Sequence, residues 1–129
     1  MKKMIGYATI LMVVLPGSAV AFDTPQLTAL KNSDIAGTCW TNTFSRGIVQ
    51  HKFNSNGTFE RTQFNNNPAS VIMWTGNWRI SSNEILQKVK NVTVEGRTSS
   101  SNDGWKQAFV VRNRQLINSS GYVYTLGCN

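Results

Sequence analysis

Residues 72–80 have the sequence IMWTGNWRI, and this stretch decides the fold class. Large apolar side chains occupy every second position, at Ile72, Trp74, Trp78 and Ile80, with Gly76 between the two tryptophans. The intervening positions hold Met, Thr, Asn and Arg. Successive side chains of a β-strand point to opposite faces, so the stretch predicts a strand with one buried face.

Shorter stretches with the same alternation surround it, and turn-forming residues separate them. Asn56-Gly57 predicts a hairpin, because both residue types tolerate the positive φ that primed turns require. Short strands every 8 to 12 residues or so, with almost no helix, are typical of a sandwich or an up-and-down antiparallel β-barrel of about eight strands. The meander-like order favours the barrel. The other predicted strands are 38–43, 46–53, 58–64, 84–90, 91–98, 105–112, 115–118 and 122–126.

Residues 1–21 are expected to be a cleavable signal peptide of bacterial type. Two lysines precede the uncharged residues 4–15, a run too short to cross a bilayer, which takes about 20 apolar residues. Small side chains then lead to an expected cut between Ala21 and Phe22. This predicts a periplasmic or secreted protein that does not span the membrane.

Beyond the signal, residues 22–36 are expected to form an N-terminal arm or a short docking helix, and residues 37–129 the β-barrel domain. Removal of the signal leaves eleven basic and six acidic residues, a net charge of +5. That charge favours acidic partners.

Basic side chains are expected to form outward patches. Lys88 and Lys90 share one face of a predicted strand, and Lys106 and Arg112 share a face of another. A solvated face is the simplest interpretation, and contact with anionic envelope polymers or an acidic protein is the functional one. Nucleic acid is disfavoured, because an exported protein does not meet it and no dense stretch interleaves basic and aromatic residues.

The two cysteines, Cys39 and Cys128, are predicted to form one disulfide, because an exported chain meets an oxidising compartment. A redox-active or metal-binding pair is less favoured, since the chain has no CxxC spacing. The bond would close a loop of 89 residues, which the chain-entropy model values at about 4 to 5 kcal/mol. It would also join the two ends of the meander, and this favours a closed barrel.

No motif predicts catalysis, a metal site or a cofactor. His51 is the only histidine; it shares strand parity with Val49 and Phe53, and we expect it to be an inward, hydrogen-bonded structural residue. The six acids are scattered, and the motifs of serine hydrolases, zinc proteases and phosphate-binding loops are missing from the sequence. A non-enzymatic protein without cofactor or metal is therefore expected, and an enzyme is the third choice.

Aromatic residues are the candidate ligand-binding residues. The interior of an eight-stranded barrel either fills with side chains or holds one small molecule. The many large side chains of this chain favour a filled core, and a cavity remains the alternative. The residues expected to line such a cavity are Trp40, Trp74, Trp78, Phe109 and Tyr124.

Three segments resemble small bacterial lipocalin-like proteins: residues 35–40 (IAGTCW), residues 53–59 with their Asn-Gly, and residues 76–80 (GNWRI) followed by 84–86 (EIL). The resemblance covers most of residues 35–126. It implies a calycin-type barrel, with Trp40 packed across the barrel floor, and an exported protein that captures a small apolar ligand.

The chain is also similar to periplasmic inhibitors of secreted metalloproteases, which are small lipocalin-like barrels with an N-terminal arm and one disulfide. That likeness implies the competing function. The protein would then be a periplasmic protein-binding module, such as an inhibitor, an immunity protein or an accessory factor of an envelope or secretion system. It would act through the arm at residues 22–35, its loops or its basic surface.

Overall fold

The computed structural model describes residues 29–128, so the expected signal peptide and the first part of the arm lie outside the described residues. Within residues 29–128, one short helix and nine antiparallel strands follow one another. They are α1 (Asn32–Ile35), β1 (Thr38–Phe44), β2 (Gly47–Phe53), β3 (Thr58–Asn66), β4 (Ala69–Ser81), β5 (Glu84–Val94), β6 (Arg97–Ser100), β7 (Lys106–Arg112), β8 (Gln115–Asn118) and β9 (Val123–Leu126).

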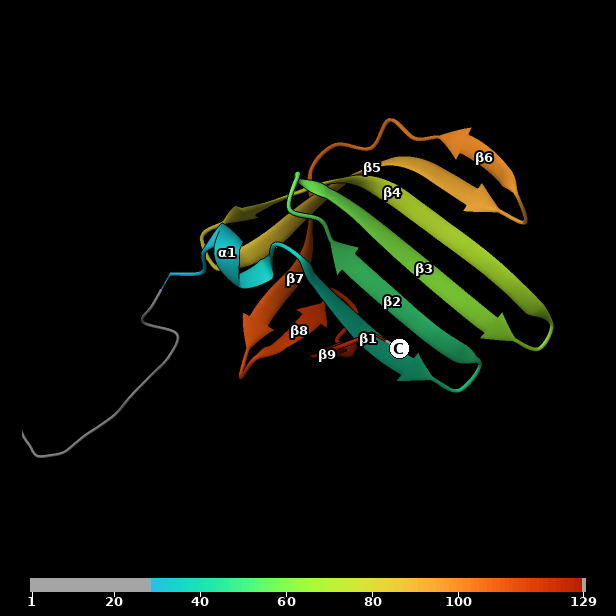
Figure 1. Cartoon of the computed structure of the whole chain (residues 1–129), viewed down its shortest axis with the longest axis horizontal. Helices are drawn as coiled ribbons and strands as arrows, with labels where there is room; N and C mark the ends of the chain where they lie inside the picture. The colour runs from blue at the N-terminus through green and yellow to red at the C-terminus, as the bar shows by residue number, and fades with distance from the viewer. Residues whose placement is uncertain (1–28, 129) are drawn as a thin grey trace, which may run out of the picture.

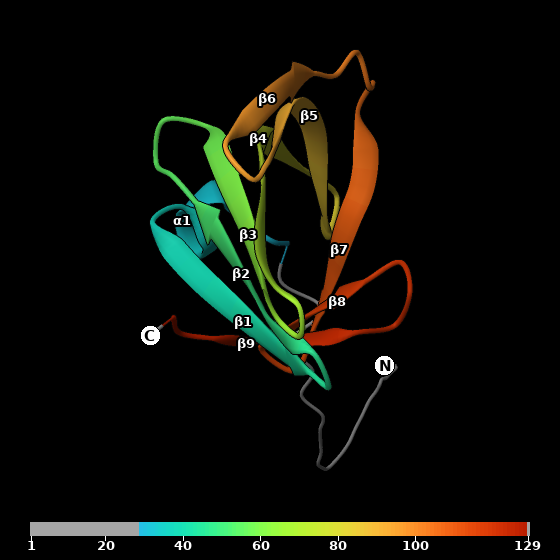
Figure 2. The same ribbon diagram turned by 90° about the vertical axis from the view of Figure 1, so that its right-hand side faces the viewer.

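Eight of these strands close into a barrel, which confirms the predicted fold class. The order in the sheet is β4-β3-β2-β1-β9-β8-β7-β5, and the pairing of β4 with β5 completes the ring. β6 lies outside the ring and pairs with β5 (Figures 1 and 2). The first and last strands, β1 and β9, are neighbours, as the meander predicts.

The hairpin between β2 and β3 forms at the predicted Asn-Gly pair, but its turn is not the predicted primed turn. Among these loop residues only Gly57 has a positive φ, of 87°, and its N–H donates to the Asn54 carbonyl at 3.1 Å. The Asn56 side chain accepts a hydrogen bond from the Thr58 N–H at 3.1 Å. The loop is thus a type I turn followed by a left-handed glycine, the usual three-residue alternative to a primed turn.

The prediction of separate strands at 84–90 and 91–98 was wrong. The chain runs through this boundary as the single strand β5, because the irregularity at Lys90 is a β-bulge rather than a turn. Gly76 faces the bulge on β4, and a Cβ there would lie 2.0 Å from the Lys88 carbonyl oxygen. The turn comes later, at Glu95 and Gly96, whose φ angles are 50° and 81°.

The helix α1 and the β2–β3 and β4–β5 turns lie together at one end of the barrel, which we call the closed end (Figure 1). Ile35 of α1 is 2% exposed and belongs to the core. The Leu30 N–H donates to the Asn83 side chain at 3.0 Å and ties the entering chain to the β4–β5 turn. The arm therefore contains a four-residue helix that contributes to the core.

The predicted disulfide is confirmed: Cys39 of β1 is bonded to Cys128, with their Cα atoms 5.6 Å apart. The Gly127 N–H also donates to the Cys39 carbonyl at 2.7 Å. Both links hold the chain after β9 against β1. Within residues 29–128 there is no helix with the length and apolar character needed to cross a membrane.

Candidate ligand-binding site in the barrel interior

Two of the five predicted ligand-binding residues, Trp74 and Trp78, lie on the predicted inner face of β4 but in different surroundings. Trp78 is 6% exposed, and its Nε1–H donates to the Asn54 carbonyl at 2.9 Å. Its ring meets that of Phe53 edge-on, with centroids 5.5 Å apart. Trp78 is therefore part of the packed closed end, whereas Trp74 is only half-buried.

The other three predicted residues, Trp40, Phe109 and Tyr124, are all buried. Phe109 and Tyr124 meet edge-on, with centroids 5.1 Å apart. The Trp40 Nε1–H donates to the Thr38 hydroxyl at 2.8 Å. These aromatic rings thus fill part of the interior, as the favoured filled core predicts for that part.

His51 sits above this aromatic cluster and is fully buried. Its ring centroid lies 4.5, 5.1 and 4.9 Å from those of Phe53, Phe59 and Phe109. The inward direction of His51 is as expected. The expected hydrogen bond is not found, since neither ring nitrogen has a partner within the described part of the chain.

Burial, and to a smaller extent the positive charge of Arg61, lowers the pKa of His51 from 6.5 to about 3. The imidazole is therefore neutral near pH 7. A neutral imidazole has one N–H donor and one nitrogen acceptor. Both are unused, and a buried polar group without a partner costs about 1 to 3 kcal/mol.

Arg61 is the cross-strand neighbour of His51 on one side and of Trp74 on the other. Its guanidinium carbon lies 4.4 Å from the centroid of the Trp74 ring. Across residues 29–128, Arg61 makes no ion pair or side-chain hydrogen bond. The sequence analysis missed this residue, although its position two residues after the buried Phe59 puts it on the inner face.

The inner face becomes more exposed away from the closed end. In the cross-strand row His51–Arg61–Trp74–Val92, His51 is buried and the other three are half-buried. In the next row, Val49 is buried, Gln63 and Ile72 are half-buried, and Val94 is 44% exposed. These rows lead toward the β3–β4 and β5–β6 turns, opposite α1 in Figure 1. We call this open part of the inner face the mouth: Arg61, Gln63, Ile72, Trp74, Val92 and Val94.

A second unsatisfied group borders the interior. Gln87 is the cross-strand neighbour of Trp78 on β5, and its buried Oε1 has no hydrogen-bond partner in the described residues. Together with His51 it leaves unused hydrogen-bonding capacity inside the barrel. The mouth and these two groups form the candidate site.

The basic residues are arranged differently from the prediction. Lys88 pairs with Asn77 and is half-buried, and Lys90 is exposed at the bulge. On β7 the register shifts by one residue between Phe109 and Gln107. This second bulge puts Lys106 and Arg112 on opposite faces, so the expectation that they share a face was wrong.

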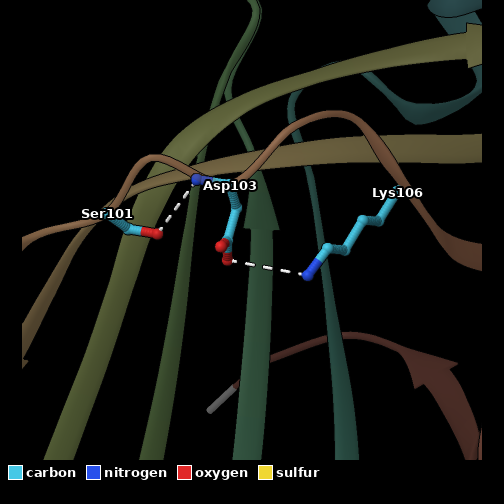
Figure 3. A network of polar contacts seen from close by, with 3 residues as sticks. All are labelled: Ser101, Asp103 and Lys106. Atoms are coloured by element: carbon cyan, nitrogen blue, oxygen red, sulfur yellow. Dashed lines mark hydrogen bonds and ion pairs between the residues drawn. The ribbon is translucent and has the colours of Figure 1, made fainter.

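Lys106 is engaged by an acid instead. Its Nζ lies 3.9 Å from Asp103 Oδ2, and the Asp103 N–H donates to the Ser101 hydroxyl at 3.4 Å (Figure 3). Both partners of the ion pair are largely exposed, and such pairs contribute little to stability. In residues 29–128, no group of three or more His, Cys, Asp or Glu side chains could hold a metal ion.

Comparison of the chain with protein-family models, with curated proteins and with solved structures found no match. The lipocalin-like resemblance of the short motifs therefore stays a prediction.

Proposed function

We propose that the mature chain is an exported, non-enzymatic binding protein that takes the apolar part of a small ligand into the mouth of its barrel. The observation that carries this proposal is the half-exposed inner face. Trp74, Ile72, Val92 and Val94 point inward, yet they are not covered by the opposite wall. A ligand that covered them would remove apolar surface from water at roughly 25 cal/mol per Å².

Three further points support the proposal. The barrel encloses its closed end with rings, so a ligand that enters at the mouth meets a rigid floor. The half-buried Arg61 adds a charged group to the same inner face. The Cys39–Cys128 disulfide fits an oxidising compartment, and therefore fits export by the expected signal peptide.

The test uses adjacent residues on opposite faces of β4. Ile72 is on the inner face and Val71 on the outer face, and both are partly exposed apolar residues. Binding of the neutral fluorescent probe N-phenyl-1-naphthylamine to the mature protein should be lost in Ile72→Asn and kept in Val71→Asn. Equal binding by both variants and the wild type, or no binding at all, would count against the proposal.

The competing function, a protein-binding module, is favoured by a different observation. Phe64 and Val71 are cross-strand neighbours on the outer face and are 38% and 45% exposed, and Ile48 extends their row onto β2. Such a row suits contact with an envelope or secreted protein. If this function holds, Val71→Asn and not Ile72→Asn should abolish co-purification of a stoichiometric protein partner.

A further inference from the structure

Arg61 is a charged residue of the mouth that has no ion-pair partner within residues 29–128. Arg61 lies on the inner face, and Arg97 follows at the rim as the cross-strand neighbour of Val94. Among the acids of the described residues, Asp34 is in α1, Glu60 and Glu84 are on the outer face beside the inward Phe59 and Ile85, and Glu95 is in the β5–β6 turn. Asp103 is paired with Lys106, which its register with the inward Gln87 puts on the inner face. Asp103 is therefore already engaged, and the charge of Arg61 has no carboxylate partner within residues 29–128.

The guanidinium carbon of Arg61 lies over the Trp74 ring, 4.4 Å from the ring centroid. Within residues 29–128, its N–H donors have no hydrogen-bond or ion-pair partner. These donors are arranged as a fork that matches the two oxygens of a carboxylate or a phosphate. The stacking on Trp74 holds the fork in place before any ligand arrives, which lowers the entropy lost on binding.

His51 is a second polar residue, beneath Arg61. It is directly opposite Arg61 on β2, is fully buried and has two nitrogens without partners. Both nitrogens are closed off from solvent, so the contact with a ligand's acidic group falls to Arg61. Next to this polar pair, Ile72, Trp74, Val92 and Val94 continue as an apolar wall toward the rim.

Building on the proposed function, we infer that the ligand is an anionic amphiphile: its acidic group is bound by Arg61, and its apolar body lies along Ile72, Trp74 and Val92. A wholly apolar ligand would bury the Arg61 guanidinium without an anionic partner, and an ionised group in that situation is strongly destabilised. A ligand with a carboxylate or phosphate removes this cost. The inference therefore changes the expected ligand from apolar to amphiphilic and acidic.

The chain offers a matched control for Arg61. Arg79 also stacks on a tryptophan, with its guanidinium carbon 4.3 Å from the centroid of the Trp105 ring, but it is exposed and lies on the outer face of β4. Arg61→Gln and Arg79→Gln thus remove the same type of Arg–Trp stack from inside and outside the barrel. Arg61→Lys keeps the charge and loses the fork.

The experiment compares decanoate with decan-1-ol, which have the same chain length, as competitors of bound N-phenyl-1-naphthylamine. The wild type and Arg79→Gln should prefer decanoate by roughly tenfold or more, as expected for charge-assisted hydrogen bonds. Arg61→Gln should lose the preference and keep its affinity for decan-1-ol, and Arg61→Lys should keep part of the preference. Circular dichroism checks that each variant folds.

The outcomes separate the two proposals. Equal displacement by decanoate and decan-1-ol, unchanged in Arg61→Gln, would overturn the inference about charge and leave the binding function standing. A loss of preference in Arg79→Gln as large as that in Arg61→Gln would place the anion on the outer surface and would also overturn it. Failure of the probe and both competitors to bind would overturn the proposed function together with the inference.

Discussion

Lowering the pH from 7 to 4 should destabilise the fold by about 3 kcal/mol through His51 alone, because its pKa is about 3 in the folded protein and 6.5 when exposed. The unfolded chain binds the proton first, so acid favours unfolding. The stabilising effect of the neutral ring is complete above pH 6.5 and is lost as the pH falls from there toward 3. For a domain of this size, 3 kcal/mol is a large part of the total stability.

The structure limits which other groups matter. Phe53, Phe59 and Phe109 pack against His51 and do not titrate, and the charged side chain beside it is that of Arg61. Arg61 stays protonated over this range. The carboxylates of the chain also titrate at acid pH, so the informative quantity is the difference between the wild type and a variant that lacks the imidazole.

The assay is urea unfolding of the mature protein at pH 7, 5.5 and 4, followed by tryptophan fluorescence. His51→Phe places a ring among the three phenylalanines and cannot be protonated, and His51→Gln serves if the larger ring does not fit. Either variant should lose about 3 kcal/mol less than the wild type between pH 7 and pH 4. The same pH dependence in the wild type and both variants would refute the assignment of a neutral, buried His51.

Three further perturbations test the frame of the barrel. Reduction of the Cys39–Cys128 bond, or replacement of both cysteines by serine, should lower the free energy of unfolding by about 4 to 5 kcal/mol, since the bond closes a loop of 89 residues. A loss below about 1 kcal/mol in a urea titration would contradict this stabilising role. Gly76→Ala should lower the free energy of unfolding by about 3 kcal/mol or prevent folding, because its Cβ would lie 2.0 Å from a carbonyl oxygen of β5. The control Gly104→Ala should leave the melting temperature unchanged, since a Cβ there meets nothing within 4 Å. Ile35→Ala should cost about 2 to 5 kcal/mol in the same titration if α1 is part of the core, and a cost near zero would show that the helix only rests on the barrel.

Most of the fold could be predicted from side-chain alternation, and the errors have a common cause. Residues 72–80 alternate without interruption and lie within β4 with the predicted inner face. β-Bulges have no fixed sequence signature, so those at Lys90 and between Phe109 and Gln107 could not be foreseen. Beyond each bulge, the alternate residues that point inward become those that point outward. This reversal led to the false division of β5 and to the wrong face for Lys106.

The candidate site was harder to predict, because it depends on which half of the barrel a residue occupies. Alternation put Trp74 and Trp78 on the same face, but it could not show that one lies at the mouth and the other in the packed end. Arg61 was overlooked because an arginine on a strand is usually solvated, although Phe59 two residues earlier indicated its direction. For His51 the direction could be predicted, while the lack of a partner depends on three rings that come from distant parts of the chain.

The short strand β9 is held in the barrel by few backbone pairings. It pairs with β1 at Trp40–Leu126 and Thr41–Thr125, and with β8 at Leu116–Tyr124 and Ile117–Val123, whereas β4 and β5 pair along nearly their whole lengths. Local opening of a native protein starts where few hydrogen bonds must break, so β9 should be the first strand to separate from its neighbours. The Cys39–Cys128 bond links β1 to the chain after β9 and keeps the released strand at a high effective concentration beside its place. After such an opening, β9 should therefore pair again quickly with β1 and β8. The neighbouring strands then do not stay exposed as an edge that another chain could join.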